Sequence, residues 1–146
     1  PEAIRKLGCS FQKARAIIEI SRAIVEGRLN LEALESATDE EAVERLMELR
    51  GVGRWTAEYT LLRGMGRWHI FPADDQGARN GLMQWLRLRK PLDARHAKRI
   101  LAPWKPYGGL IYFHILMNGL EDAGYLDCRD GRLDGHPLST PAAGLI

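Results

Sequence analysis

Two adjacent carboxylates, Asp74 and Asp75, follow the short segment F-P-A and precede the residues Q-G-A-R. A carboxylate close to a reacting centre can stabilise developing positive charge and can orient or deprotonate water. At the start of a helix, the dipole would favour such an anion by about 0.3–1 kcal/mol. Aspartate is also a preferred N-cap, and taken alone a cap is the commoner use. The two roles can divide, with Asp74 as the cap and Asp75 as the reactive carboxylate.

A glycine hairpin precedes these carboxylates in the segment L-R-G-V-G-R-W-T-A-E-Y, residues 49–59. Apolar helical patterns lie on both sides of it, so we expect two helices joined by a tight turn in which the glycines permit positive φ and a close backbone approach. The free N–H groups at the start of the second helix would seat a phosphate oxygen. An αα-hairpin whose glycines serve only the turn is the simpler alternative. The candidate phosphate-binding residues are Arg50, Gly51, Val52, Gly53 and Arg54.

The segments G-V-G-R-W-T-A-E-Y, F-P-A-D-D and W-K-P-Y, the last with a long apolar helix, occur in this order. In this combination the chain resembles the helix-hairpin-helix (HhH-GPD) superfamily of DNA base-excision glycosylases, and within it the 3-methyladenine DNA glycosylase II branch. The resemblance covers roughly residues 1–124. It implies an all-α glycosylase domain that here lacks the first helices of the family, so that the chain is expected to be a fragment.

The resemblance also assigns roles to individual residues. It places the catalytic aspartate at Asp75, with Asp74 as its neighbour, and it places Trp55 and Tyr59 in the pocket for the base. Bifunctional relatives that also cut the strand have a lysine where this chain has Trp55. The implied enzyme is therefore monofunctional: it removes a damaged base and leaves an abasic site.

The implied partner is double-stranded DNA that contains a damaged base, and the implied substrate is an alkylated base such as 3-methyladenine. Such a base must be flipped out of the duplex at a cost of a few kcal/mol. Many alkylated purines are cationic, and the faces of Trp55 and Tyr59 would attract them by about 0.5–2 kcal/mol. Core packing of one of these rings is the alternative. Alternative functions are a non-catalytic DNA-binding hairpin module and a glycosylase for uracil, hypoxanthine or oxidised bases.

We expect at most one bound cofactor, a cation. The resemblance implies a monovalent or calcium-like cation at the hairpin, held by the backbone carbonyls of Met47, Leu49 and Val52. No other cofactor is expected. Cys9 and Cys128 are the two cysteines of the chain, whereas an iron–sulfur cluster of the family's kind needs four.

Composition supports one domain with a real core: 146 residues, 45% of them hydrophobic, with a net charge of +2. Basic residues gather in residues 87–105 and acidic ones in residues 32–48, so one side of the protein could dock a phosphate backbone. No signal peptide or membrane-spanning run is evident. We expect a monomer, associated with DNA in the cytoplasm of a bacterial or archaeal cell.

Helical periodicity and capping residues predict the elements. We expect helices over residues 11–26, 30–36, 94–101 and 107–120, a hairpin over about 46–64, and a catalytic segment over about 71–86. Thr38 and Glu41 predict a capping box for the helix that enters the hairpin. His114, inside the longest apolar run, is expected in the core. Residues 1–126 would form the domain and residues 127–146 a loop-like tail.

Overall fold

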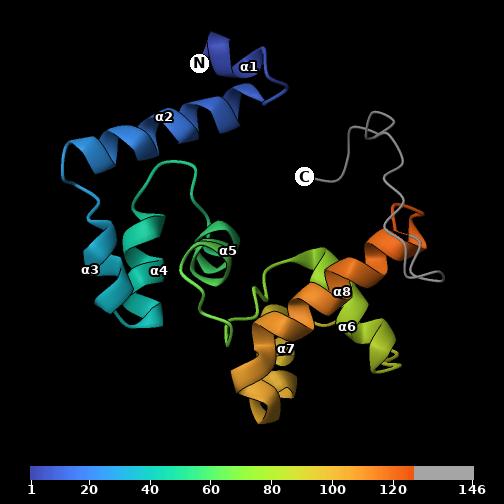
Figure 1. The fold of residues 1–146 in the computed structure, drawn as a ribbon. Helices are drawn as coiled ribbons and strands as arrows, with labels where there is room; N and C mark the ends of the chain where they lie inside the picture. The colour runs from blue at the N-terminus through green and yellow to red at the C-terminus, as the bar shows by residue number, and fades with distance from the viewer. Residues whose placement is uncertain (127–146) are drawn as a thin grey trace.

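The computed structural model describes residues 1–126, and they form helices and loops with no strand (Figure 1). The predicted all-α fold is therefore confirmed, while the predicted C-terminal tail lies outside the described residues. None of the helices in residues 1–126 is both long and apolar enough to cross a membrane. The elements are α1 (Glu2–Arg5), α2 (Phe11–Val25), α3 (Leu31–Ser36), α4 (Asp39–Met47), α5 (Arg54–Gly64), α6 (Gln76–Trp85), α7 (Ala94–Leu101), the 3₁₀ helix η1 (Ala102–Tyr107) and α8 (Gly108–Asp122).

Side-chain caps fix the starts of the predicted helices. Ser10 accepts a hydrogen bond from the amide of Lys13 at 3.2 Å, and α2 begins after it. The Thr38 amide donates to the Glu41 carboxylate at 2.9 Å, which completes the predicted capping box of α4. Each such cap is worth about 1 kcal/mol. The structure adds two short elements that the sequence did not predict, α1 and η1.

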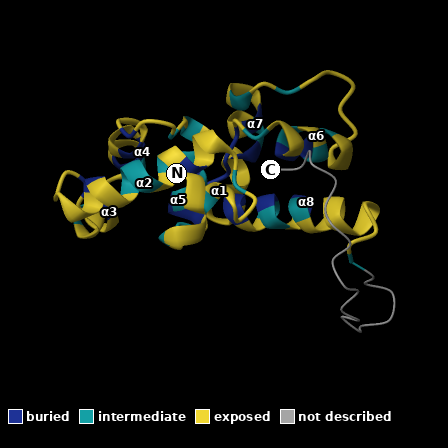
Figure 2. Cartoon of the chain, turned by 90° about the horizontal axis from the view of Figure 1, so that it is seen from above, coloured by how far each residue is buried: buried dark blue, intermediate teal, exposed yellow. Residues whose placement is uncertain are grey.

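Two hydrophobic cores lie on opposite sides of α5. Leu34, Val43 and Leu61 belong to the first core, which joins α2, α3, α4 and α5. Leu62 and Tyr112 belong to the second, which joins α5 to α6, α7 and α8. The buried residues follow the inner faces of the helices in both groups (Figure 2). Because the adjacent Leu61 and Leu62 are both fully buried, α5 is held from two sides.

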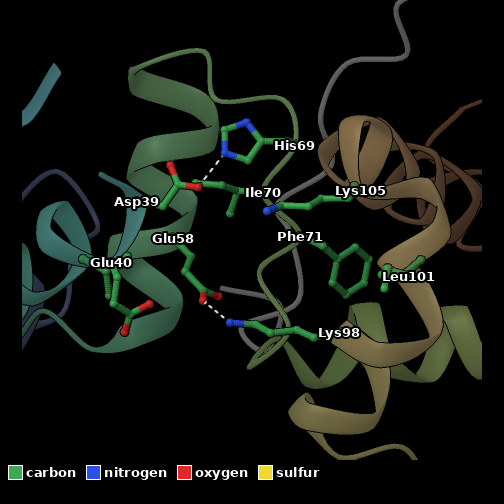
Figure 3. Close-up of a pocket in the computed structure, with 12 residues that line it drawn as sticks. Asp39, Glu40, Glu58, His69, Ile70, Phe71, Lys98, Leu101 and Lys105 are labelled. Carbon is green, nitrogen blue, oxygen red and sulfur yellow. Dashed lines mark hydrogen bonds and ion pairs between the residues drawn. The ribbon is translucent and has the colours of Figure 1, made fainter. Parts of the chain in front are cut away.

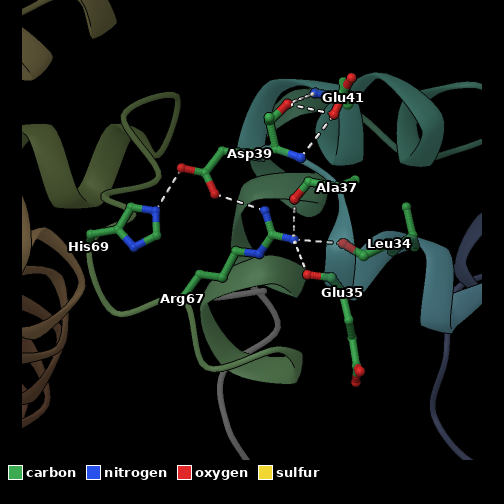
Figure 4. Close-up of polar contacts among 8 residues, drawn as sticks. Leu34, Glu35, Ala37, Asp39, Glu41, Arg67 and His69 are labelled. Atoms are coloured by element: carbon green, nitrogen blue, oxygen red, sulfur yellow. Dashed lines mark hydrogen bonds and ion pairs between the residues drawn. The ribbon is translucent and has the colours of Figure 1, made fainter.

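The linker between α5 and α6 is anchored by Arg67 (Figure 4). Its guanidinium donates to the carbonyls of Leu34 at 2.6 Å and Ala37 at 2.9 Å, and to the Asp39 carboxylate at 2.8 Å. His69 contacts the other oxygen of Asp39 at 2.6 Å. Burial opposes the ionisation of Asp39, but the hydrogen bonds with His69 and Arg67 outweigh it and lower the pKa of the carboxyl. The linker is thereby tied to α3 and α4.

The start of α8 lies directly against the same linker. The Gly109 amide donates to the Trp68 carbonyl at 2.7 Å. A methyl group at Gly109 would overlap the side chain of Leu62, and one at Gly108 would lie 2.5 Å from the His69 carbonyl oxygen. Only glycine permits this approach of the helix to the linker.

The prediction that His114 lies in the core is wrong, because its side chain is exposed. Tyr112 and Ile115 of α8 are buried. With about 100° of rotation per residue, His114 lies on the opposite side of the helix from Tyr112.

Two glycine substitutions within α8 test the close approach. Gly109→Ala should lower the free energy of unfolding by about 1–3 kcal/mol, because the added methyl group meets Leu62 and the Trp68 backbone. Gly119→Ala is the control, since a methyl group there meets nothing within 4 Å; it should be neutral or stabilise by up to about 1 kcal/mol. Urea unfolding followed by circular dichroism measures both. Equal effects of the two substitutions would contradict the packing described here.

Candidate active site at the start of α6

Asp75 lies at the N-terminus of α6 and accepts three hydrogen bonds. Its Oδ1 accepts from the Ala78 amide at 2.9 Å, and its Oδ2 accepts from the indole Nε1 of Trp55 at 2.8 Å and from the hydroxyl of Tyr112 at 2.7 Å. The carboxylate is half-buried. Three donors from three helices therefore fix its position and orientation.

The predicted division of roles between the two aspartates is wrong. Asp75 itself is the N-cap of α6, whereas the Asp74 side chain is exposed and has no hydrogen-bond partner within residues 1–126. One oxygen of Asp75 serves the cap, and the other is held by side chains of α5 and α8. A cap and a functional carboxylate can thus be the same residue, because a carboxylate has two oxygens.

Trp55 and Tyr59 lie on one face of α5, as their spacing predicts. Their rings stack with centroids 5.3 Å apart and an interplanar angle of 17°. Trp55 is 38% exposed, and Tyr59 is partly buried against the ring of Tyr112. Since Tyr59 covers one face of the indole, a planar ligand that leaves this stack intact can lie only on the other face.

Tyr112 is a site residue that the sequence analysis missed. Its side chain is 1% exposed and contacts the rings of Phe71, Tyr59 and Phe113 edge-on. Burial and the bond to Asp75 raise the pKa of its phenol, so the hydroxyl remains a donor. One feature of the sequence could have indicated this role: Tyr112 lies within an apolar helix, and a buried tyrosine hydroxyl needs a hydrogen-bond partner.

The predicted hairpin is present between α4 and α5. The Val52 amide donates to the Leu49 carbonyl at 3.1 Å, which closes the turn. Gly51 has φ +90°, a conformation that requires glycine, and a methyl group built there would lie 3.2 Å from Cβ of Ala16. Gly53 differs from the prediction: its φ is −95°, and a methyl group there would point into open space.

The two arginines of the hairpin have different environments. Arg50 is exposed and forms no ion pair within residues 1–126. Arg54 contacts the Glu40 carboxylate at 2.6 Å and the Glu58 carboxylate at 3.5 Å. No side chain caps the N-terminus of α5, so its first N–H groups face outward. Arg50 and these amides are free for a ligand, while Arg54 is already paired with carboxylates.

A second polar cluster, also missed, lies between α5 and α7 (Figure 3). Glu58 is 4% exposed, and one of its oxygens accepts a hydrogen bond from Nζ of Lys98 at 2.7 Å. The other oxygen is buried without a partner in the described part of the chain. The pair borders a cavity of about 280 Å³ that Asp39, His69 and Lys105 also line. It joins the two halves of the fold and is separate from the Asp75 site.

The carbonyls expected to hold a cation belong to the end of α4 and the hairpin. That of Leu49 already accepts the Val52 amide, which leaves it one lone pair. No group of three His, Cys, Asp or Glu side chains within residues 1–126 could hold a metal ion. Any cation here would therefore depend on backbone oxygens.

Known proteins resemble this chain in sequence and in fold. DNA-3-methyladenine glycosylase 1 of Schizosaccharomyces pombe is 37% identical over 90 residues, which are 61% of this chain and 40% of that protein. DNA-3-methyladenine glycosylase 2 of Escherichia coli K12 is 30% identical over 116 residues, 79% of this chain and 38% of that protein. No family model matches the chain.

The solved structure of 3-methyladenine DNA glycosylase (Mag1) from S. pombe in complex with abasic DNA superposes with a TM-score of 0.71 at 29% identity. The match covers 86% of this chain and 61% of that one. This chain thus spans less than half of the length of the curated relatives above. From its sequence and its helical architecture together, the chain resembles the helix-hairpin-helix superfamily of DNA glycosylases and, within it, 3-methyladenine DNA glycosylase II.

Proposed function

We propose that the chain carries the catalytic part of a monofunctional DNA glycosylase that removes alkylated bases, such as 3-methyladenine, from duplex DNA. The observation that carries the proposal is the Asp75 carboxylate, held by Trp55, Tyr112 and the start of α6. A hairpin that only binds phosphate needs no oriented carboxylate. The names of the relatives support the same substrate class.

The geometry supports separate sites for a backbone phosphate of the DNA and for the flipped base. The uncapped start of α5 and Arg50 would bind a backbone phosphate, and the open space beside Gly53 lets the DNA strand come close. The flipped base would stack on the uncovered face of Trp55, where a cationic purine gains a cation–π attraction. Asp74, exposed next to Asp75, lies at the edge of this site.

The reaction breaks the bond between C1′ of the sugar and the base nitrogen, and the bonding electrons leave with the base. A base that carries a positive charge leaves as a neutral molecule, so no strong general acid is needed. The Asp75 carboxylate would stabilise the positive charge that develops on the sugar and accept a proton from the attacking water. With tryptophan rather than lysine at position 55, no amine is present there to attack C1′ and lead to strand cleavage.

The remaining expectations complete the proposal. A monovalent or calcium-like cation would be held by the carbonyls of Met47, Leu49 and Val52, beside the phosphate. It would supply positive charge opposite the DNA backbone. The protein would act on damaged DNA as a monomer.

Asp75→Asn tests the catalytic role. The amide oxygen can still accept from the Ala78 amide, so the fold should persist, while release of methylated bases should fall at least about a hundredfold because the negative charge is lost. The assay counts alkali-labile abasic sites in methylated duplex DNA, with DNA binding measured in parallel. Asp93→Asn, at the N-cap of α7, is the matched control and should leave release unchanged.

Two outcomes of this experiment would count against the proposal. If Asp75→Asn released bases as fast as the unchanged chain, Asp75 would not be the catalytic carboxylate. If the unchanged chain bound DNA but released no base, a non-catalytic DNA-binding module would be the better reading.

Tyr112→Phe tests the positioning of the carboxylate. The ring and its packing remain, and only the hydroxyl that donates to Asp75 is lost. The single-turnover rate of base release should fall about tenfold, which corresponds to ~1.4 kcal/mol, with DNA binding unchanged. Tyr125→Phe, at an exposed tyrosine, is the control. A rate equal to that of the control would show that Trp55 and the helix start suffice to orient Asp75.

A further inference from the structure

A basic cavity lies between the hairpin and α2, and Asp75 is not among the residues that line it. Its volume is about 370 Å³. The residues that matter for its chemistry are Gln12, Arg15, Ala16, Arg22, Arg50 and Gly51. The sequence motifs assign α2 no functional role, and the proposed reaction uses none of its residues.

Helix α2 is fixed against the hairpin by close packing. Figure 1 shows the loop between α4 and α5 rising toward α2. At the contact, a methyl group on Gly51 would lie 3.2 Å from Cβ of Ala16, and Ala14 and Ala23 of α2 are fully buried. Arg15 and Arg22 are seven positions apart, about two turns, so they lie on the same face of α2. Both line the cavity together with Arg50 of the hairpin. Their distance from the hairpin is set by the fold rather than by a mobile loop.

The three arginines around this cavity have no carboxylate partner within residues 1–126. Arg15, Arg22 and Arg50 form no ion pair within residues 1–126, whereas Arg28, Arg54 and Arg67 each do. Glu19 also lines the cavity, but its carboxylate is 3.2 Å from the guanidinium of Arg28. The cavity is therefore a concentration of positive charge that the protein itself does not neutralise.

We propose that Arg15 and Arg22 of α2 bind phosphates of the DNA strand next to the phosphate seated at the hairpin. This inference rests on the proposed function, because it extends the DNA path from the hairpin along α2. A guanidinium presents two parallel N–H donors that match a phosphodiester. Both side chains are exposed on a rigid helix, and Arg50 joins them to the hairpin. Such contacts bind any sequence and set the register of the duplex on the enzyme.

The salt dependence of binding to undamaged duplex DNA tests this inference. Each phosphate contact contributes about 0.9 to the slope of log K against log salt concentration, so Arg15→Ala with Arg22→Ala should reduce the slope by about 1.8. The control is Arg45→Ala, which removes one positive charge from an exposed position of α4, within the acidic residues 32–48. The control should change the slope little. Arg15→Lys with Arg22→Lys should retain most of the slope, because lysine also binds phosphate as a point charge.

If the α2 pair shifted the slope no more, per charge removed, than the Arg45 control, the inference would be overturned, since the effect would then be one of net charge. Circular dichroism of each variant shows whether α2 is intact. Base release separates this inference from the proposed function. If the unchanged chain released no methylated base but the α2 variants still lost slope, the phosphate site would stand and the enzyme assignment would fall. If base release depended on Asp75 but the salt slope did not depend on Arg15 and Arg22, the enzyme assignment would stand and the phosphate site on α2 would fall.

Discussion

The contact between the first turn of α8 and the linker before α6 is the constraint on which the site depends. The Gly109 amide donates to the Trp68 carbonyl, and neither Gly108 nor Gly109 leaves room for a side chain. Tyr112 follows one turn later on α8, and Asp75 follows the linker at the start of α6. Because the contact fixes both segments, the hydroxyl of Tyr112 reaches Oδ2 of Asp75 at 2.7 Å. The two glycines therefore help to position the Asp75 carboxylate, because they fix both the first turn of α8, which leads to Tyr112, and the linker, which leads to Asp75.

Helix α5 connects this carboxylate to the hairpin. Its first residues follow the glycine turn, its Trp55 donates to Asp75, and Leu61 and Leu62 bind it into separate cores. A displacement of the hairpin would move Trp55 and disturb the Asp75 site. The buried pair of Glu58 and Lys98 adds a polar link from α5 to α7, so the helix is held from the second core as well. Binding of a backbone phosphate at the start of α5 would thus be coupled mechanically to the position of the catalytic group.

The arginines separate into two groups by their partners. Arg67 and Arg54 contact carboxylates or carbonyls of the protein and hold its elements together. Those around the cavity beside α2 have no such partner, and they lie next to the hairpin. Net charge alone, which is +2, gives no indication of this division. The environment of each guanidinium decides whether it serves folding or remains available to an anion.

The sequence by itself determined the local features of this protein: the helices and their caps at Ser10 and Thr38, the glycine hairpin, and the pairing of Trp55 with Tyr59 on one face. These depend on hydrogen bonds and spacings of three or four residues, which can be read along the chain. Only the tertiary structure decided that Asp75 is both cap and candidate catalyst, that Tyr112 holds it, and that Gly53 has no need of positive φ. The bonds from Trp55 and Tyr112 to Asp75 span 20 and 37 positions, and such contacts arise only when two cores and a close backbone approach have placed three helices together.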